Sequence, residues 1–311
     1  MNKISIIGAG MTGATAAHWL AERELADLVL VDVVEGMPQG KALDLLEAMP
    51  IIAKDVEIVG ANDYAATKDS DIIIITAGLA RKPGMSRDDL LTKNAEIVGA
   101  AATETLKHSP DAIFIVLTNP LDTMAYLTMR KTGLPRERVI GQAGILDSAR
   151  MRAFVAMETG VSVENIDCYV LGGHGDEMVP LTRHSNIAGI PLNEYLPADK
   201  LEAIVNRTRK GGGEIVNLLK TGSAYYAPSM ACTQMAEAIL KNKHLIVPCA
   251  AYMNGEYGLN DMYFGVPVML GRTGMEKIIE YTFNDDEKAM FEKSAASVKE
   301  THEALKKLVT L

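Results

Sequence analysis

The sequence predicts an α/β fold in which a doubly wound parallel sheet is followed by a mixed α+β region. In the first half of the chain, short β-rich runs alternate with longer segments of helical spacing. Such alternation requires parallel crossovers and so predicts a doubly wound sheet. The pattern changes near Gly144, beyond which helices predominate and short strands come with frequent glycines. We therefore expect two domains, residues 1–144 and residues 145–311.

The first half contains the elements of the parallel sheet. Strands are predicted at residues 3–7, 28–33, 56–59, 72–76, 112–117 and 139–141. Helical spacing occurs at residues 12–23, 40–48 and 88–107. Runs such as residues 72–76 are nearly continuous in apolar side chains, as expected of strands covered on both faces.

The second half is predicted to be richer in helices. Helical patterns cover residues 147–159, 199–221, 227–241 and 285–308. The strand-like pieces, at residues 168–171, 246–252 and 264–270, are expected to form antiparallel hairpins. No glycine-, serine- or proline-rich linker separates the halves, so they are expected to pack rigidly together.

Composition limits the classes of function. The chain has 311 residues, 48% hydrophobic and 23% charged, which is typical of a globular protein. A net charge of −9 without basic clusters argues against nucleic-acid binding, and any anionic substrate must be bound by a local group of arginines. No apolar run reaches 18 residues, so we expect a cytoplasmic protein without a membrane partner. Cys168, Cys232 and Cys249 are spaced for neither a disulfide framework nor a metal site.

The first motif is a glycine-rich turn, Gly8-Ala9-Gly10-Met11-Thr12-Gly13, between a predicted strand and a predicted helix. Alone it could be a simple turn. In this context the glycines permit a tight turn, backbone approach to a pyrophosphate and close packing of helix on strand. The helix N-terminus adds N–H donors and partial positive charge. The motif therefore predicts a Rossmann dinucleotide-binding site.

Asp32 supports this prediction. It ends the second predicted strand, 19 residues beyond Gly13, where a carboxylate can accept hydrogen bonds from the adenosine ribose. The alternative is an aspartate that caps the next loop. A carboxylate here also repels the extra phosphate of NADP, and residues 33–36 include no arginine to attract it. NAD is therefore the expected cofactor.

Candidate catalytic groups follow several strands. His174 is flanked by glycines directly after a predicted strand, which makes its imidazole accessible, although a surface histidine is the simpler interpretation. Asp147 and Arg150 lie three residues apart at the start of a helix and share a face. A capping aspartate with an exposed arginine is the alternative.

Two loops at the carboxyl ends of predicted strands are further candidates. Arg81 and Arg87 lie in a loop that also contains Pro83 and Gly84 and follows residues 72–76. Loops in that position bind ligands in this architecture, although a solvated run of charge would look the same. Asn119-Pro120 follows the next strand and could adopt a cis peptide.

Together these motifs resemble the lactate/malate dehydrogenase family, and within it the lactate dehydrogenase-like malate branch. The resemblance covers essentially the whole chain and rests on GAGMTG, VLVD, TAGLARKPGMSR, TNPLD, GILDSAR and GGHGDEMVP, in the family's order. It implies NAD-dependent interconversion of (S)-malate and oxaloacetate by a homo-oligomer, either a dimer or a tetramer.

The resemblance also implies roles for matching residues. His174 would carry the proton and Asp147 would fix its tautomer, while Arg150 would hold a substrate carboxylate. Arg87 would polarise the reacting carbonyl and Asn119 would bind the substrate oxygen. The loop at residues 79–90 would close over the site. The implied cofactor-binding residues are Gly8, Gly10, Met11, Thr12, Gly13, Asp32, Thr76, Ala77, Gly78, Asn94, Thr118 and Asn119.

Arg81 selects the substrate in this interpretation. The family places arginine there when the substrate has a second carboxylate and glutamine when it has a methyl group. A carboxylate removed from water needs a paired cation, so Arg81 indicates malate over lactate. Ala224 stands where lactate enzymes usually have threonine, and its small side chain leaves room for a diacid.

Three other classes of protein share some of these features. A lactate or other 2-hydroxyacid dehydrogenase of the same family is disfavoured by Arg81. A short-chain dehydrogenase would need Tyr-x-x-x-Lys, which occurs at Tyr64 and Lys68, but in a polar connector expected to lie away from the carboxyl ends of the strands. A non-enzymatic NAD-binding sensor would not need His174, Asp147 and several arginines.

Overall fold

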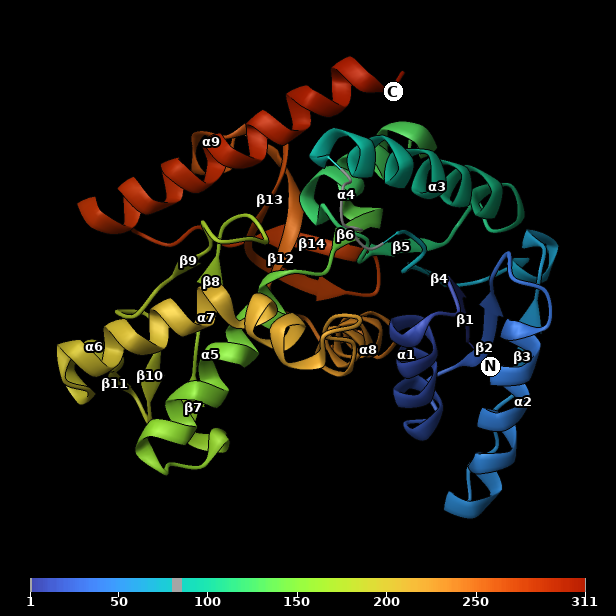
Figure 1. Ribbon diagram of the computed structural model, residues 1–311, viewed down its shortest axis with the longest axis horizontal. Coiled ribbons are helices and arrows are strands. Elements are labelled where there is room, and N and C mark those ends of the chain that lie inside the picture. Colours follow the sequence, from blue (N-terminus) through green and yellow to red (C-terminus); the bar gives the residue numbers. More distant parts are fainter. Residues whose placement is uncertain (1, 80–85, 311) are drawn as a thin grey trace.

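A computed structural model describes residues 2–79 and 86–310, apart from the side chain of Arg87. Its centre is a nine-stranded sheet of order β14-β13-β12-β6-β5-β4-β1-β2-β3 (Figure 1). Six strands from the first half run parallel: β1 (Lys3–Ile7), β2 (Asp27–Val31), β3 (Ile58–Ala61), β4 (Ile72–Ile75), β5 (Ile113–Val116) and β6 (Val139–Gly141). The predicted doubly wound sheet is confirmed, and the strand order reverses between β1 and β4.

Successive side chains of each strand point to opposite faces of the sheet, and this divides the core into two layers. Ile72 and Ile74 of β4 belong to one buried cluster, and Ile73 and Ile75 belong to the other. The first cluster includes α1 (Met11–Glu22) and α8 (Tyr226–Leu240), and the second includes α3 (Arg87–His108) and α4 (Leu121–Thr132). In Figure 1, α3, α4 and α9 (Asp285–Leu308) lie above the sheet, while α1 and α8 lie below it. Strands covered on both faces explain the apolar runs.

Three strands of the second half extend this same sheet. β12 (Leu245–Asn254), β13 (Asn260–Gly271) and β14 (Gly274–Ile278) form an antiparallel set, as predicted for the first two. β12 joins β6 through the pair Ala250–Gly141. The expected division at residue 144 stays a prediction, since the sheet continues across it.

The rest of the second half forms a smaller α+β layer. Its strands make a three-stranded sheet of order β11-β10-β7 and a two-stranded sheet of β8 and β9. The strand bounds are β7 (Ile166–Asp167), β8 (Val170–Leu171), β9 (Val179–Pro180), β10 (Asn186–Ile187) and β11 (Ile190–Pro191). The helices are α5 (Gly144–Thr159), α6 (Leu192–Tyr195) and α7 (Ala198–Leu219).

Several predicted boundaries need correction. α2 (Met37–Ala48) begins three residues before the predicted start, with a proline in its first turn, where the missing N–H costs nothing. α4 is missing from the predicted elements, since the polar residues Asp122, Thr123 and Thr128 lie among its buried positions from Leu121 to Met129. Single-turn 3₁₀ segments also occur, at η1 (Met49–Ile52), η2 (Tyr64–Thr67), η3 (Arg136–Arg138), η4 (Val163–Asn165) and η5 (Glu256–Gly258). Across the described ranges, no helix is both long and apolar enough to span a bilayer.

Candidate active site

The glycine-rich turn connects β1 to α1 at the point where the strand order reverses. Gly8 has φ +105°, a conformation that side chains rarely adopt. A Cβ on Gly13 would lie 1.8 Å from the carbonyl oxygen of Gly8, so the helix can pack this closely only with glycine. A Cβ on Gly10 would meet nothing within 4 Å, which leaves open space beside the backbone. This is the geometry that a pyrophosphate requires.

Asp32 lies beside this turn. Its Oδ2 accepts a hydrogen bond from the Ala9 N–H at 2.8 Å, and its Oδ1 accepts one from the Val34 N–H at 3.0 Å. Two ionised carboxylate oxygens offer about four acceptor positions, so capacity remains for ribose hydroxyls. Asp32 therefore ties the turn to β2 and still suits the adenosine half of NAD. The simple capping interpretation accounts for only the Val34 bond.

The ends of β4 and β5 complete this edge. Thr76 Oγ1 donates to the Gly8 carbonyl at 2.9 Å, and Thr118 Oγ1 donates to the Ala77 carbonyl at 2.7 Å. A Cβ on Gly78 would lie 2.4 Å from Thr118 Cγ2. The structure thus brings the predicted cofactor-binding segments together, with Met11 and Thr12 in the first turn of α1.

His174 and Asp147 form a hydrogen-bonded pair. The distance from His174 Nδ1 to Asp147 Oδ2 is 2.9 Å, and their side chains are 19% and 3% exposed. An ionised carboxylate only accepts, so Nδ1 carries the proton and Nε2 is left to exchange one with a substrate. The negative charge of Asp147 raises the pKa of His174, against the opposing effect of burial.

Arg150 lies on α5, the same helix as Asp147, and contacts the pair. Its Nη1 donates to Asp147 Oδ1 at 3.2 Å, three residues along α5, as the sequence predicted. A Cβ on Gly211 of α7 would lie 2.3 Å from Arg150 Cδ, so glycine there makes room for the arginine stem. Its side chain is 10% exposed, which excludes the interpretation as a solvated surface arginine.

The structure describes only some of the other residues that were predicted to bind the substrate. Asn119 is exposed, and its bond to Pro120 is cis. Arg81 lies outside the described residues. Arg87 is the first residue of α3, and its side chain also lies outside them.

Asp122 is a site residue that the motif analysis did not single out, although it ends the quoted TNPLD sequence. Its Oδ2 accepts from the His174 backbone N–H at 3.0 Å, and burial raises its pKa to about 6. Ser294 Oγ of α9 accepts from the preceding N–H, that of Gly173, at 3.0 Å. The signal available in the sequence was a carboxylate two residues beyond the Asn119-Pro120 pair, in the first turn of α4.

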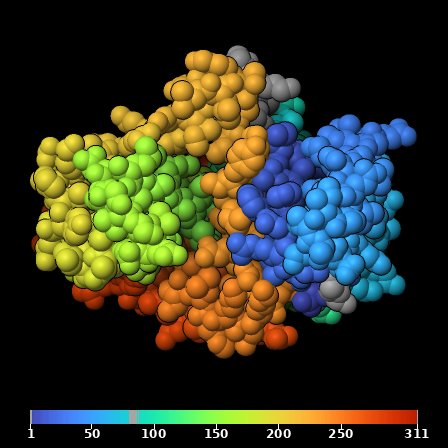
Figure 2. Space-filling view, turned by 90° about the horizontal axis from the view of Figure 1, so that it is seen from below, coloured from blue at the N-terminus to red at the C-terminus, as the bar shows by residue number. Residues whose placement is uncertain are grey.

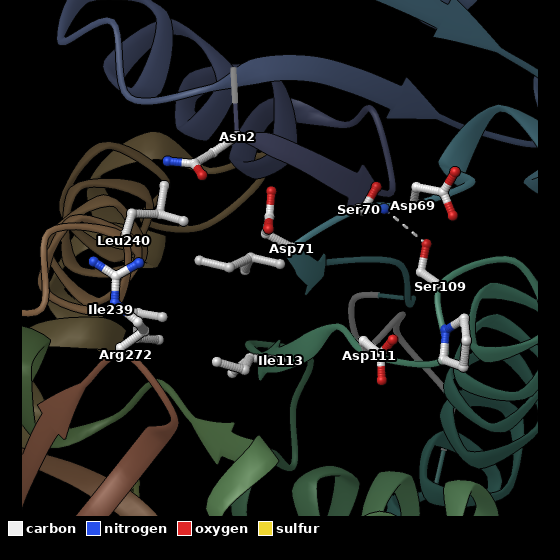
Figure 3. Close-up of a pocket in the computed structure, with 12 residues that line it drawn as sticks. Asn2, Asp69, Ser70, Asp71, Ser109, Asp111, Ile113, Ile239, Leu240 and Arg272 are labelled. Carbon is white, nitrogen blue, oxygen red and sulfur yellow. Dashed lines mark hydrogen bonds between the residues drawn. The ribbon is translucent and has the colours of Figure 1, made fainter.

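A cleft at the opposite edge of the sheet is unrelated to these groups. It lies at the amino ends of the parallel strands, between Asn2, Asp71, Ser109 and Arg272 (Figure 3). The Tyr64–Lys68 segment also lies toward this edge, because the carbonyls of Ala66 and Lys68 accept from the ammonium of Lys3 at the start of β1. Tyr64 and Lys68 are thus not placed as a short-chain dehydrogenase pair. Within the described ranges, no three His, Cys, Asp or Glu side chains are grouped to hold a metal.

A dinucleotide turn and a histidine–aspartate pair at one edge of a sheet define a nicotinamide-dependent dehydrogenase. Comparison with known proteins gives the family. The model for the lactate/malate dehydrogenase NAD binding domain matches residues 2–141, and that for the lactate/malate dehydrogenase alpha/beta C-terminal domain matches residues 145–309. The chain belongs to the lactate/malate dehydrogenase family, and NAD is its cofactor.

Individual relatives agree. The malate dehydrogenase of Roseiflexus castenholzii is 59% identical over 98% of this chain and 99% of its own length. The apo malate dehydrogenase structure from Picrophilus torridus has a TM-score of 0.96 at 47% identity, covering 99% of this chain and 98% of that one. A Cryptosporidium parvum lactate dehydrogenase bound to lactic acid and nicotinamide adenine dinucleotide has a TM-score of 0.95 at 39% identity, with 98% of each chain covered.

The charge of Asp147 leads to a prediction about His174. In Asp147→Asn the amide keeps the shape but loses the charge that favours the imidazolium, so the pKa of His174 should fall. NMR titration of the imidazole in parent and variant measures this. An equal or higher pKa for His174 in the variant would contradict the conclusion that the charge of Asp147 raises it.

Proposed function

We propose that the protein catalyses NAD-dependent oxidation of (S)-malate to oxaloacetate and the reverse reaction. The observation that carries the proposal is the His174–Asp147 pair, 2.9 Å apart, with Nε2 of the imidazole left for a substrate proton. A sensor or structural NAD-binding protein has no need for a paired and largely buried acid–base group. Arg150 adds a cation beside it for an anionic substrate.

The residues divide the work of the reaction. In the direction of oxidation, His174 Nε2 accepts the hydroxyl proton, and Asp147 stabilises the imidazolium that forms. NAD, when bound, accepts the hydride. Arg150 holds the carboxylate next to the reacting carbon, and Asn119 binds the substrate oxygen. Arg87 polarises that oxygen in the reverse direction. Neutral His174 is required for oxidation and protonated His174 for reduction.

Arg81 supports malate rather than lactate as the substrate. The Roseiflexus castenholzii relative, 59% identical, is a malate dehydrogenase, and the chain also resembles a Cryptosporidium parvum lactate dehydrogenase in fold. Only a diacid needs a second cation, and the sequence supplies Arg81 in the loop after β4. The small Ala224 is consistent with a larger substrate.

The primary test is NADH oxidation by oxaloacetate in the parent protein and in His174→Asn. The parent should turn over, and the variant should lose about a hundredfold or more in kcat, since general acid–base catalysis contributes roughly 10²–10⁴. The Kd for NADH should change little. An inactive parent would refute the proposed function, and a variant that keeps most of its turnover would refute the role of His174.

The substrate assignment is tested with Arg81→Gln. Leaving one substrate carboxylate buried and unpaired costs about 3–5 kcal/mol, or about two to four decades of kcat/KM for oxaloacetate. Pyruvate should gain, but by less than oxaloacetate loses, because glutamine relieves the unpaired guanidinium without building a tight apolar fit. The ratio of kcat/KM for the two oxoacids is measured at one pH and saturating NADH. A change below about tenfold would mean that the second carboxylate is held elsewhere.

We further propose that the protein is a homo-oligomer and that α2 with η1 forms part of its interface. Only Pro38 and Ala42 of α2 are buried, whereas Leu43 is 56% exposed and Ile51 of η1 is 85% exposed. Figure 2 shows this blue part of the surface uncovered by any other element. Contiguous exposed apolar side chains of this kind mark protein–protein contacts.

Ile51→Asp tests the interface. A carboxylate placed in an apolar contact should dissociate the oligomer or shift its dissociation to higher protein concentration, as seen by sedimentation velocity. Leu308→Asp, which changes an exposed leucine at the end of α9, is the matched control and should leave the assembly unchanged. A parent that sediments as a monomer, or an Ile51 variant with unchanged assembly, would contradict the proposal.

A further inference from the structure

The ends of β4 and β5 stay joined beyond the last residues of the two strands. The Leu117 N–H donates to the Ile75 carbonyl at 3.0 Å, and the Thr118 hydroxyl then bonds the Ala77 carbonyl at 2.7 Å. The next link comes from outside both segments, from the side chain of Asn94 on α3. Segments 76–79 and 117–119 therefore lie at a spacing that side chains help to set.

Asn94 bonds both segments at once. Its Oδ1 accepts from the Leu79 N–H at 2.8 Å, and its Nδ2 donates to the carbonyls of Leu79 at 3.2 Å and Asn119 at 2.7 Å. The residue is 1% exposed. An amide nitrogen has two hydrogens, and both are used here. No donor of this side chain remains for a dinucleotide, although the sequence resemblance placed Asn94 among the cofactor-binding residues.

We infer that Asn94 is a positioning residue, which fixes the Asn119 backbone against residue 79 and thereby sets the geometry of the substrate site. The inference rests on the proposed function, because Asn119 is the residue there that binds the substrate oxygen. Asn94 also lies seven residues, or about two turns, beyond Arg87 on α3, so its three bonds fix how that helix sits along its axis. Its loss should affect the oxoacid far more than NADH.

The experiment compares Asn94→Ala with Thr105→Ala. Thr105 is a fully buried side chain on the same helix, but its hydroxyl bonds only carbonyls of α3, at Ala101 and Ala102. Asn94→Ala should lower kcat/KM for oxaloacetate by about ten- to a hundredfold, while the Kd for NADH, measured by fluorescence, changes by less than about threefold. Thr105→Ala should change neither constant by more than about threefold. If Asn94→Ala fails to fold, Asn94→Ser, whose shorter hydroxyl cannot bridge both segments, should give the same split.

A double-mutant cycle with Asn119→Ala separates positioning from a general structural effect. If Asn94 acts through Asn119, the double variant should be little worse than Asn119→Ala alone. If the losses in kcat/KM of the two single variants multiply in the double variant, the inference is overturned. It is also overturned if the Kd for NADH rises by the same factor as kcat/KM falls, since that marks a direct cofactor ligand. An unchanged kcat/KM would overturn it as well. An inactive parent instead refutes the proposed function, which keeps the two failures distinct.

Discussion

The close pairing of β6 with β12 is the constraint on which the arrangement of the site depends. A Cβ on Gly141 would lie 2.8 Å from the Ala250 Cβ, and one on Gly144 would lie 2.6 Å from the Pro248 Cβ. Glycine at both positions lets the antiparallel hairpin join the parallel sheet directly. α5 starts at this junction and carries Asp147, while β13 accepts the Gly172 N–H next to the His174 loop. Both members of the acid–base pair are therefore held by the sheet that carries the dinucleotide turn.

The charges at the site are arranged so that a proton can move with little reorganisation. Asp147 lies between two cationic or potentially cationic groups, His174 and Arg150, with its two oxygens divided between them. Taking up a proton at His174 therefore creates a positive charge next to a carboxylate already in place. Asp122 accepts from the His174 backbone, and burial raises its pKa to about 6, which limits the negative charge near the pair as the pH falls. Arg150 thus places a local positive charge at the site within a chain of net charge −9.

The features that could be predicted from the sequence are those that short-range residue patterns specify. The six parallel strands, the glycine turn with Asp32 and the i, i+3 pair of Asp147 and Arg150 all follow from short-range spacing. α4 was not predicted because polar Asp122, Thr123 and Thr128 lie among its buried positions. The hairpin's place in the first sheet depends on the long-range Gly141–Ala250 pair. Asp122 and Asn94 act through backbone groups far away in sequence, 52 residues for His174 and 25 for Asn119, and no local pattern records such a bond.

The two faces of the sheet hold different parts of the candidate site in place. On the face with α1 and α8, fully buried Ser229 donates to the Thr12 carbonyl at 2.7 Å, which anchors the helix that follows the dinucleotide turn. On the face with α3 and α4, Asn94 donates a hydrogen bond to the Asn119 backbone, and Asp122 accepts one from the His174 backbone. Because the faces share only the sheet, a change in packing on one side reaches the other through the strands. The dinucleotide turn on one side, and the backbones of Asn119 and His174 on the other, are thus held by separate sets of buried polar side chains.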